Sequence, residues 1–359
     1  MRALYFGTYE RDYPRNAQVI SCLRRAGVEV TEHHANVWDG RDQWHAGLGA
    51  AARLAAAELE LLRRPRHDFD VLIVGYPGHM DLPAARRAAR GRPIVFNPLV
   101  SLADTFVSDR RRFRPGSVPA RILTAIDRRA LRAADLVVAD TGANAAYLAA
   151  LADLPADRVR TCFVGAEERV FRPGWKPQDP FTCLFVGKLI PLHGLDTILT
   201  AARAAPELPF RLVGDGQLEL LLQDRPPNVE WIRWVEYERL PDELHRAGCA
   251  LGIFGTSDKA RRVIPNKAFQ AIACGTPLVT ADTPAARELL VDGESALLVP
   301  PGDGQALAKA LRRLAADPDL AQALRAGGHA AYEEHASEDV LGRRWRGLLE
   351  EAIAVRSTR

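Results

Sequence analysis

The sequence contains 359 residues, of which 47% are hydrophobic and 26% are charged. This length is greater than one ordinary hydrophobic core supports and predicts two domains, and this composition excludes a largely disordered chain. Lys and Arg total 48 against 45 Asp and Glu, so the small net charge of +3 gives no support for nucleic acid as a partner.

The sequence shows no signal for export or for metal binding. The N-terminal residues MRALYFGTY do not have the basic-then-apolar layout of a signal peptide, and no apolar run approaches the roughly 18–20 residues that span a bilayer. We therefore expect a cytoplasmic protein. The five cysteines have no CxxC spacing, so we expect buried free thiols and no metal site.

Short apolar runs alternate with Ala/Leu/Arg-rich stretches of helical period, which is typical of βαβ units around a parallel sheet. In the first half, strands are expected at Ala3–Phe6, Val71–Val74, Ile94–Phe96, Leu136–Ala139 and around Cys162–Val164. In the second half, strands are expected at Cys183–Val186, Phe210–Val213, Val229–Ile232, Ala250–Phe254, Leu278–Thr280 and Ala296–Val299.

A Pro-rich, charged stretch that ends at Pro180 disfavours both helix and strand and is the expected linker. We expect an α/β protein with one doubly wound parallel sheet over residues 1–175 and a second over residues 181–338. Ligands are expected in the cleft between them, at the carboxyl ends of the strands. The last part, residues 339–359, contains an amphipathic helix expected over Asp339–Ala354 that packs back on the first domain.

Each half opens with a strand that runs directly into a glycine, Gly7 in ALYFGTY and Gly187 in CLFVGKL. Glycine there lets another backbone approach closely, although a tight turn without a ligand has the same sequence. Neither half contains GxGxxG, which argues against a dinucleotide-dependent oxidoreductase. Gly187 is followed by Lys188, His193 and a helix expected to begin near Leu195. The free N–H groups of that helix end and the charge of Lys188 predict an anion site that fits a diphosphate.

A second helix with an anion-attracting end is expected downstream, before Gly275 and Pro277. Asn266 suits its N-cap, and Gly275 suits the position just after its last turn. The ligand-binding residues expected at its start are Ile264, Pro265, Asn266 and Lys267. Gln270 lies one turn into the helix, where its amide is expected to bond ligand hydroxyls.

Aromatic and polar side chains follow Gly7 and are expected to face the cleft. These side chains can stack on a sugar acceptor and form hydrogen bonds with it. They belong to Tyr9, Tyr13, Arg15 and Asn16. Farther along, the basic run from Arg110 to Arg114 is interpreted either as a contact with anionic lipid or as a solvated loop.

Several runs of the sequence carry a family resemblance. In the second half these runs are FVGKLIPLHGLDTI, RLVGDGQLE, NVEWIRWVEYERLPDELHRAGCALGIF and NKAFQAIACGTPLVTADTPAARELLVDG, and in the first half they are ADLVVADTGANAAYLAAL and RTCFVGAEERVFRP. Together they resemble family 4 glycosyltransferases of GT-B architecture, and the two runs of the first half are similar to the end of the family's N-terminal domain. The resemblance covers nearly the whole chain. It implies two Rossmann-like domains, of which the first binds an acceptor and the second a nucleotide-diphosphate sugar.

The resemblance also implies roles for individual residues. Lys188 is expected to bind the donor diphosphate, and His193 stands where the family usually has a second Lys. The backbone at Trp234 and Val235 is expected to contact the nucleotide base. Gly7 is expected to let backbone amides meet the phosphate and the transferred sugar.

The sequence departs from the family at a pair of glutamates separated by seven residues. The second glutamate is replaced by Gln270, which can still accept hydrogen bonds from ribose hydroxyls. The first is replaced by Arg262, which cannot read the donor hexose as a carboxylate does. Many relatives carry a His near the reacting sugar. Asn97 stands at that place, and His79 follows another strand either as a catalytic group or as a turn residue.

We therefore expect metal-independent transfer of a hexosyl or related group from a nucleotide-diphosphate sugar, with retention of anomeric configuration and without a cofactor. The catalytic candidates are Lys188, His193, His79 and Asn97. Peripheral contact with the inner membrane face is a further expectation. Two alternatives stay open: a non-catalytic nucleotide-sugar-binding subunit, motivated by the missing glutamates, and a sugar-nucleotide epimerase of the same architecture, whose usual carboxylates are absent.

Overall fold

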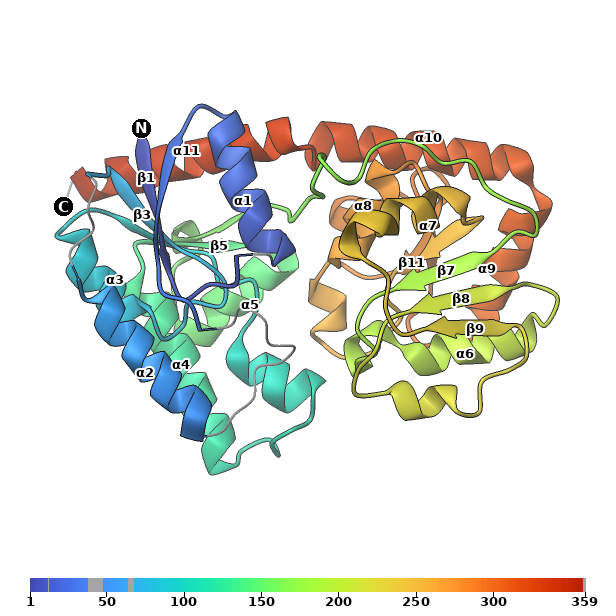
Figure 1. Cartoon of the computed structure of the whole chain (residues 1–359), viewed down its shortest axis with the longest axis horizontal. Helices are drawn as coiled ribbons and strands as arrows, with labels where there is room; N and C mark the ends of the chain where they lie inside the picture. Colours follow the sequence, from blue (N-terminus) through green and yellow to red (C-terminus); the bar gives the residue numbers. More distant parts are fainter. Residues whose placement is uncertain (12, 38–47, 64–67, 358–359) are drawn as a thin grey trace. The chain divides into compact units, whose positions relative to one another are not determined.

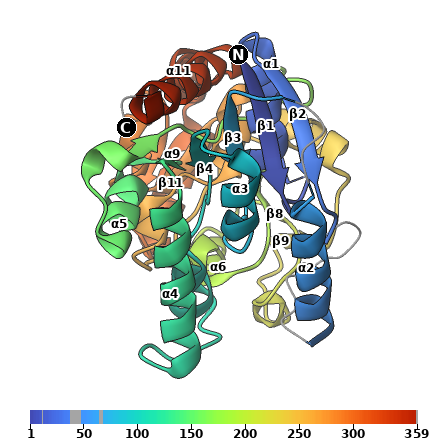
Figure 2. The ribbon, with the colours of Figure 1, turned by 90° about the vertical axis from the view of Figure 1, so that its left-hand side faces the viewer.

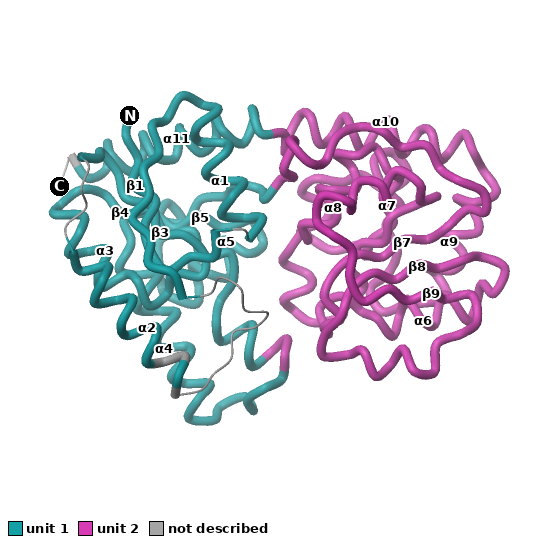
Figure 3. The backbone as a smooth tube through the Cα atoms, in the orientation of Figure 1, with its two compact units in different colours: residues 1–107, 111–164, 338–359 teal, residues 108–110, 165–337 magenta. Residues whose placement is uncertain are grey.

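The computed structural model describes residues 1–11, 13–37, 48–63 and 68–357. The chain forms two compact units (Figure 3). Unit 1 consists of Met1–Val107, Arg111–Val164 and Glu338–Arg359, and unit 2 consists of Ser108–Arg110 and Gly165–Ser337.

Unit 1 contains a parallel sheet of six strands with the order β2-β1-β3-β4-β5-β6. The strands are β1 (Arg2–Gly7), β2 (Glu29–His34), β3 (Val71–Val74), β4 (Ile94–Phe96), β5 (Leu136–Ala139) and β6 (Val159–Thr161). The strand order changes direction between β1 and β3, and such switch points are where open α/β sheets bind ligands, beyond the carboxyl ends of the strands.

Apolar residues on both faces of the sheet explain why helices cover unit 1 on two sides. In β1, Ala3 and Tyr5 belong to one buried cluster, and Leu4 and Phe6 belong to another. Helices α1 and α11 cover the first face, while α2, α3, α4 and α5 cover the second (Figure 2). These helices are α1 (Pro14–Arg25), α2 (Leu48–Leu61), α3 (Leu82–Ala89), α4 (Val118–Ala133), α5 (Gly142–Ala152) and α11 (Glu338–Ser357).

Unit 2 contains a second parallel sheet of six strands, with the order β12-β11-β10-β7-β8-β9. Its strands are β7 (Cys183–Val186), β8 (Phe210–Val213), β9 (Val229–Ile232), β10 (Cys249–Leu251), β11 (Leu278–Ala281) and β12 (Leu297–Val299). Here the strand order changes direction between β7 and β10, which is the Rossmann arrangement. Two doubly wound parallel sheets confirm the predicted fold class.

The two faces of the second sheet are covered by different helices (Figure 1). Cys183 and Phe185 of β7 pack in one cluster with α6 and α9, whereas Leu184 and Val186 face α7 and the start of α8. Helix α10 packs on α8 and α9. The helices are α6 (Leu195–Ala204), α7 (Leu240–Arg246), α8 (Asn266–Ala273), α9 (Gly304–Ala316) and α10 (Pro318–His335).

Three strands differ from the sequence prediction for identifiable reasons. Strand β2 has the sequence EVTEHH, a polar edge strand without the apolar run that marks a buried strand. Strand β6 ends at Thr161, just before the segment around Cys162–Val164 where a strand is predicted. Strand β10 ends at Leu251 because the hydroxyl of Thr280, rather than a neighbouring backbone carbonyl, bonds the N–H of Ile253.

Candidate functional site

The strongest site candidate lies at the carboxyl end of β7, beside the switch point of the unit 2 sheet. Strand β7 ends at Val186, and Gly187 follows with a φ of +145°, a conformation that side chains rarely allow. A Cβ atom at Gly187 would lie 2.7 Å from Nζ of Lys267 and 3.4 Å from Cε1 of His193. The missing side chain therefore leaves two nitrogen-bearing side chains adjacent to the end of the strand.

Lys188 stands next to this glycine and is ion-paired. Its Nζ lies 2.9 Å from Oδ1 of Asp215, and the two side chains are 50% and 45% exposed. The backbone of Asp215 also accepts a hydrogen bond from the N–H of Leu189, which ties the loop after β8 to the loop after β7. The structure thus brings Lys188 and His193 to one strand end, as predicted, and adds Asp215, which sequence analysis passed over within the run VGDGQ.

His193 is buried at the end of a 3₁₀ turn, Pro191–His193, just before α6. Its Nδ1 contacts the carbonyl oxygen of Lys188, which can only accept, so Nδ1 carries the proton. Burial holds the pKa of His193 well below its usual value. His193 is therefore neutral at pH 7, with Nε2 as an acceptor.

The turn that carries His193 is held by a buried ion pair that sequence analysis missed. Asp109 accepts a hydrogen bond from the N–H of Leu192 at 3.0 Å, and Nζ of Lys259 lies 3.5 Å from the same carboxylate. Both charged side chains belong to unit 2 and are buried. Their pairing joins residues 150 positions apart, and no local sequence signal predicts it.

Lys267 is the second residue of α8, and its side chain points into the interior beside β7. Its Nζ is buried, lies 3.6 Å from the ring centroid of Phe185 and has no hydrogen-bond partner among the described residues. Burial holds the pKa of Lys267 well below its usual value. A buried amine without an acceptor is costly when charged, so this site favours the neutral form until an anion arrives.

Gln270 lies one turn farther along α8 and is buried. Gln270 and Lys267 line a small cavity of about 10 Å³ whose other walls are apolar. The hydroxyl of Tyr237 also lies close to the Gln270 side chain, and burial raises the pKa of Tyr237. Lys267 and Gln270 thus share one face of α8 with β7, next to Gly187.

The remaining predicted donor residues differ in their exposure to solvent. Trp234 is largely exposed, Val235 is half-buried and Ile264 is buried. The N-cap of α8 is Pro265, and Asn266 is the first helical residue, so the prediction of Asn266 as the N-cap is wrong by one position. The prediction failed because Asn suits a cap by its side chain, but no side-chain cap bond forms here.

In unit 1, Gly7 also meets a side chain rather than open space. A Cβ atom at Gly7 would lie 2.2 Å from Oδ2 of Asp81, and that oxygen accepts a hydrogen bond from the N–H of Thr8 at 2.7 Å. Burial raises the pKa of Asp81, and burial together with Asp81 raises that of Glu58 to about 9. Glu58 is therefore protonated at pH 7, and Gly7 makes room for the carboxyl group of Asp81.

His79 and Asn97 are both buried near the carboxyl ends of β3 and β4. Nε2 of His79 lies 3.3 Å from Oδ1 of Asp127, and the same carboxylate accepts a hydrogen bond from Ser101 at 2.7 Å. Burial lowers the pKa of His79, so the ring is neutral. Oδ1 of Asn97 accepts a hydrogen bond from Arg15 at 3.1 Å.

The predicted acceptor residues do not all face open space. Arg15 is fully buried, donates to the carbonyl oxygens of Cys162 and Phe163 and lies over the Trp345 ring. Asn16 and Tyr9 are buried as well: Asn16 bonds Tyr5 and the carbonyl oxygen of Tyr76, and the hydroxyl of Tyr9 donates to the exposed Glu32. The expectation that these three side chains face the cleft is corrected, because their polar atoms are bonded within unit 1.

Tyr13 is the exception among the predicted acceptor residues. It is half-buried and packs at 4.7 Å against the ring of Tyr76. Unlike Tyr9, Arg15 and Asn16, it is therefore not fully enclosed in unit 1.

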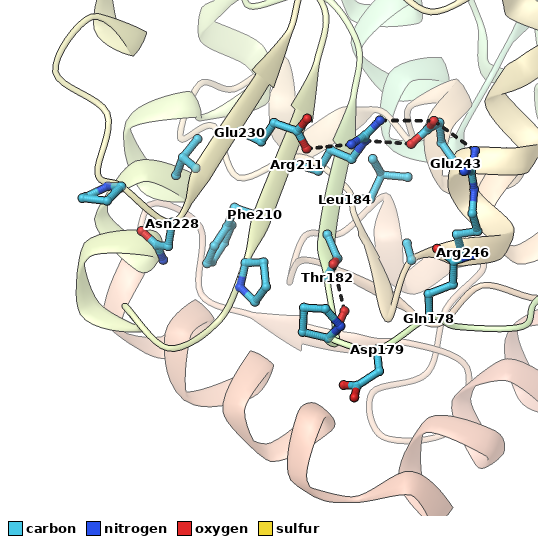
Figure 4. A pocket seen from close by; sticks show the side chains of 15 residues that line it. Gln178, Asp179, Thr182, Leu184, Phe210, Arg211, Asn228, Glu230, Glu243 and Arg246 are labelled. Atoms are coloured by element: carbon cyan, nitrogen blue, oxygen red, sulfur yellow. Dashed lines mark hydrogen bonds and ion pairs between the residues drawn. The ribbon is translucent and has the colours of Figure 1, made fainter.

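A hollow of about 430 Å³ lies elsewhere in unit 2, at the edge where β7, β8 and β9 begin (Figure 4). Its charged side chains neutralise one another. Arg211 pairs with Glu230 at 2.6 Å and with Glu243 at 2.8 Å, and Arg246 pairs with Glu243 at 3.3 Å. Parallel strands end at the opposite edge, where Gly187 lies, so we do not place the functional site in this hollow.

Two further properties concern only the residues that the structure describes. No group of three or more His, Cys, Asp or Glu side chains is arranged to hold a metal ion among them. Of their helices, none has the length and apolarity required to cross a bilayer.

Comparison with known proteins relates this arrangement to one family. A family model described as "Glycosyl transferases group 1" matches residues 180–317, which include Gly187 and Gln270. The chain is 27% identical to a D-inositol 3-phosphate glycosyltransferase of Nocardioides sp., over 93% of this chain and 83% of that one. It is 24% identical to the lipopolysaccharide core biosynthesis glycosyltransferase LpsE of Rhizobium meliloti, over 92% and 93%.

Another D-inositol 3-phosphate glycosyltransferase, from Catenulispora acidiphila, is 31% identical, and the match spans 54% of its length. Among solved structures, Anabaena HepE in complex with UDP-glucose is similar with a TM-score of 0.69 and 16% identity, over 98% of this chain and 100% of that one. Residues 180–317 thus match a domain of the glycosyl transferases group 1 family, and the chain is similar along most of its length to glycosyltransferases and has the GT-B fold.

Proposed function

We propose that this glycosyltransferase moves a sugar from a nucleotide-diphosphate donor, bound at the carboxyl end of β7, to an acceptor bound by unit 1. The observation that carries the proposal is the close approach of Lys267 and His193 to Gly187, with Lys188 next in the chain. Helices α6 and α8 begin after β7 and β10, which are neighbouring strands of the sheet. Cationic side chains and free N–H groups together suit a diphosphate.

The roles of the other donor residues follow from their positions. Gln270 is proposed to bond the ribose hydroxyls, and the backbone at Trp234 and Val235 to contact the base. Ile264, Pro265 and Asn266 form the approach to α8, whose N-cap residue makes no side-chain cap bond to its first N–H groups. HepE is solved with UDP-glucose, so UDP-glucose is the first donor to test.

The chemistry proposed is transfer with retention of configuration, as the resemblance to family 4 implies. The departing diphosphate carries the charge that develops as the glycosidic bond breaks, and preorganised cations stabilise it. Lys188 and Lys267 supply that charge through side chains, so no metal ion is needed in this proposal. The acceptor hydroxyl is positioned on the same face of the sugar as the leaving group.

The acceptor is proposed to bind near Tyr13 and His79 of unit 1. His79 is neutral and held by Asp127, which is the arrangement of an oriented imidazole able to take part in proton transfer. Asn97, bonded to Arg15, is proposed to shape the same end of the sheet. The relatives are named for different acceptors, so the acceptor class remains for experiment.

A peripheral membrane contact is proposed at the start of α4. Val118 and Ile122 lie one turn apart on this helix and are 69% and 54% exposed. Exposed arginines accompany them: Arg111, Arg112, Arg114 and Arg121. Apolar side chains beside clustered positive charge suit the surface of an anionic bilayer.

This contact is tested by co-sedimentation with phosphatidylcholine vesicles that contain or lack phosphatidylglycerol. Binding is expected only to the anionic vesicles, and replacing Val118 and Ile122 together by Ser is expected to weaken it. Equal binding of the double variant would show that the helix start is a solvated surface.

The function is tested by incubating the protein with UDP-glucose, ADP-glucose or GDP-mannose and analysing the products. Release of nucleoside diphosphate together with transferred or free sugar supports a glycosyltransferase, and the anomeric configuration of the product tests retention. An isomerised donor would indicate an epimerase. Binding of a donor without any turnover would indicate a non-catalytic subunit.

A further inference from the structure

The Nζ atom of Lys267 is buried in the proposed donor site and has no hydrogen-bond partner among the residues that the structure describes. It is enclosed by Phe185 and by the apolar walls of the small cavity that Leu184 and Leu251 help to form. Gly187 lies directly beside this nitrogen, since a Cβ atom there would be 2.7 Å from it. An anion that settles at Gly187 would therefore be the acceptor that Lys267 lacks.

His193 cannot supply the missing charge in its resting state. The one proton of the neutral ring lies on Nδ1, which donates to the Lys188 carbonyl, so Nε2 presents a lone pair toward its surroundings. A lone pair does not bond a phosphate oxygen. The position where relatives usually have a second Lys thus offers no cation here.

We propose that Lys267 is a diphosphate-binding residue that is neutral in the free protein and takes up one proton when the donor binds. This inference rests on the proposed donor site. The step is balanced: the amine accepts a proton from solvent, and the ammonium formed is neutralised by the diphosphate. Lys267 thus replaces, from α8, the charge that His193 cannot provide from the turn before α6.

The titratable groups around Lys267 are few and come from separate segments. His193 is the near neighbour, and Lys188 beside it is paired with Asp215. The positive charges of Arg110 and Lys259 help to lower the pKa of His193, and Lys259 is paired with Asp109. On the other side, Tyr237 lies next to Gln270, with Glu167 and Arg169 near its hydroxyl.

Among these groups Lys267 is the one expected to take the proton. An amine is intrinsically far more basic than an imidazole, by about four pKa units. Burial lowers the pKa of both Lys267 and His193. A bound anion raises the pKa of the nitrogen that it contacts, because it stabilises the protonated form. Lys267 Nζ is also free to bond the anion directly, whereas protonated His193 would add a second charge beside it.

Proton uptake is measured by calorimetric titration with UDP-glucose at about pH 8 in HEPES and in Tris, whose heats of ionisation differ. This donor has no phosphate that titrates near that pH, so uptake reports on the protein. The wild-type protein is expected to take up about one proton per donor. Lys267→Met is expected to bind at least about tenfold more weakly and without uptake.

Two matched variants locate the proton. Lys309→Met removes an exposed lysine of α9 and is expected to leave affinity and uptake unchanged. His193→Asn keeps a donor toward the Lys188 carbonyl and is expected to retain uptake. If uptake persisted in Lys267→Met and disappeared in His193→Asn, the titrating group would be His193, and the inference would be wrong.

The measurement separates this inference from the function on which it rests. Donor binding by the wild type without any dependence on buffer would overturn the role of Lys267 and leave the donor site in place. Failure to bind UDP-glucose, ADP-glucose and GDP-mannose alike would overturn the donor site itself and this inference with it. The wild-type result does not depend on whether any variant folds.

Discussion

Lys188 and Asp215 form an ion pair at the carboxyl ends of β7 and β8, with Nζ and Oδ1 2.9 Å apart. Half-exposed pairs of this kind contribute at most about 1 kcal/mol, so a doubly charged diphosphate can displace the carboxylate. We predict that Asp215→Asn binds a nucleoside diphosphate about two- to fivefold more tightly, because Lys188 is released and a repulsive charge is removed. Calorimetry tests this, with the exposed Asp224→Asn as the control; weaker binding would show that Asp215 supports the site.

Gln270 is buried on α8 and is proposed to bond the ribose. Loss of one neutral hydrogen bond costs about 1 kcal/mol, so Gln270→Ala should weaken nucleotide binding about fivefold. Gln223→Ala, at an exposed position of the same unit, should have no effect. Equal affinity of Gln270→Ala and wild type in a titration with UDP would remove Gln270 from the donor site.

Burial and the neighbouring Asp81 raise the pKa of Glu58 in unit 1 to about 9. The folded protein thus holds a proton that the unfolded chain releases near pH 4–5, so the free energy of unfolding should fall as the pH rises toward 9. Glu58→Gln keeps a neutral side chain and should make the melting temperature less dependent on pH over this range. Exposed Glu60→Gln should melt like the wild type at every pH; an identical profile for Glu58→Gln would contradict the raised pKa of Glu58.

Activity should survive removal of divalent metal ions. In the proposed mechanism the charges that face the diphosphate belong to Lys188 and Lys267, and a metal ion would compete with them for the same oxygens. We predict unchanged transfer rates after dialysis against EDTA. Loss of activity on chelation, restored by Mg²⁺ or Mn²⁺, would show that a metal ion carries part of the charge.

The fold was predictable because its central strands are short apolar runs between helical stretches. Buried strands such as Val71–Val74 and Cys183–Val186 appear in the structure as the sequence predicts. The polar edge strand β2 was missed because its side chains are half exposed and show no apolar run. The resemblance to GT-B glycosyltransferases is confirmed, and membership of family 4 stays a prediction.

The site was predictable only in part, because residue type does not reveal orientation. The grouping of Gly187, Lys188 and His193 followed from their spacing on one strand end. Arg15 is buried by contacts with Cys162 and Trp345, which lie far away in the sequence. No local sequence pattern predicts this burial. The same limit hid the buried, unpartnered Nζ of Lys267, which looks from the sequence like an ordinary lysine at a helix start.

The central claim is that a donor diphosphate binds at the end of β7, and Lys188→Ala tests it most directly. A charge-assisted hydrogen bond contributes roughly 1.5–3 kcal/mol, so this variant should bind UDP about 10- to 150-fold more weakly by calorimetry. Uridine, which has no phosphate, should bind the variant and the wild type equally. A folded Lys188→Ala protein that binds UDP as tightly as the wild type would contradict the account and place the donor elsewhere.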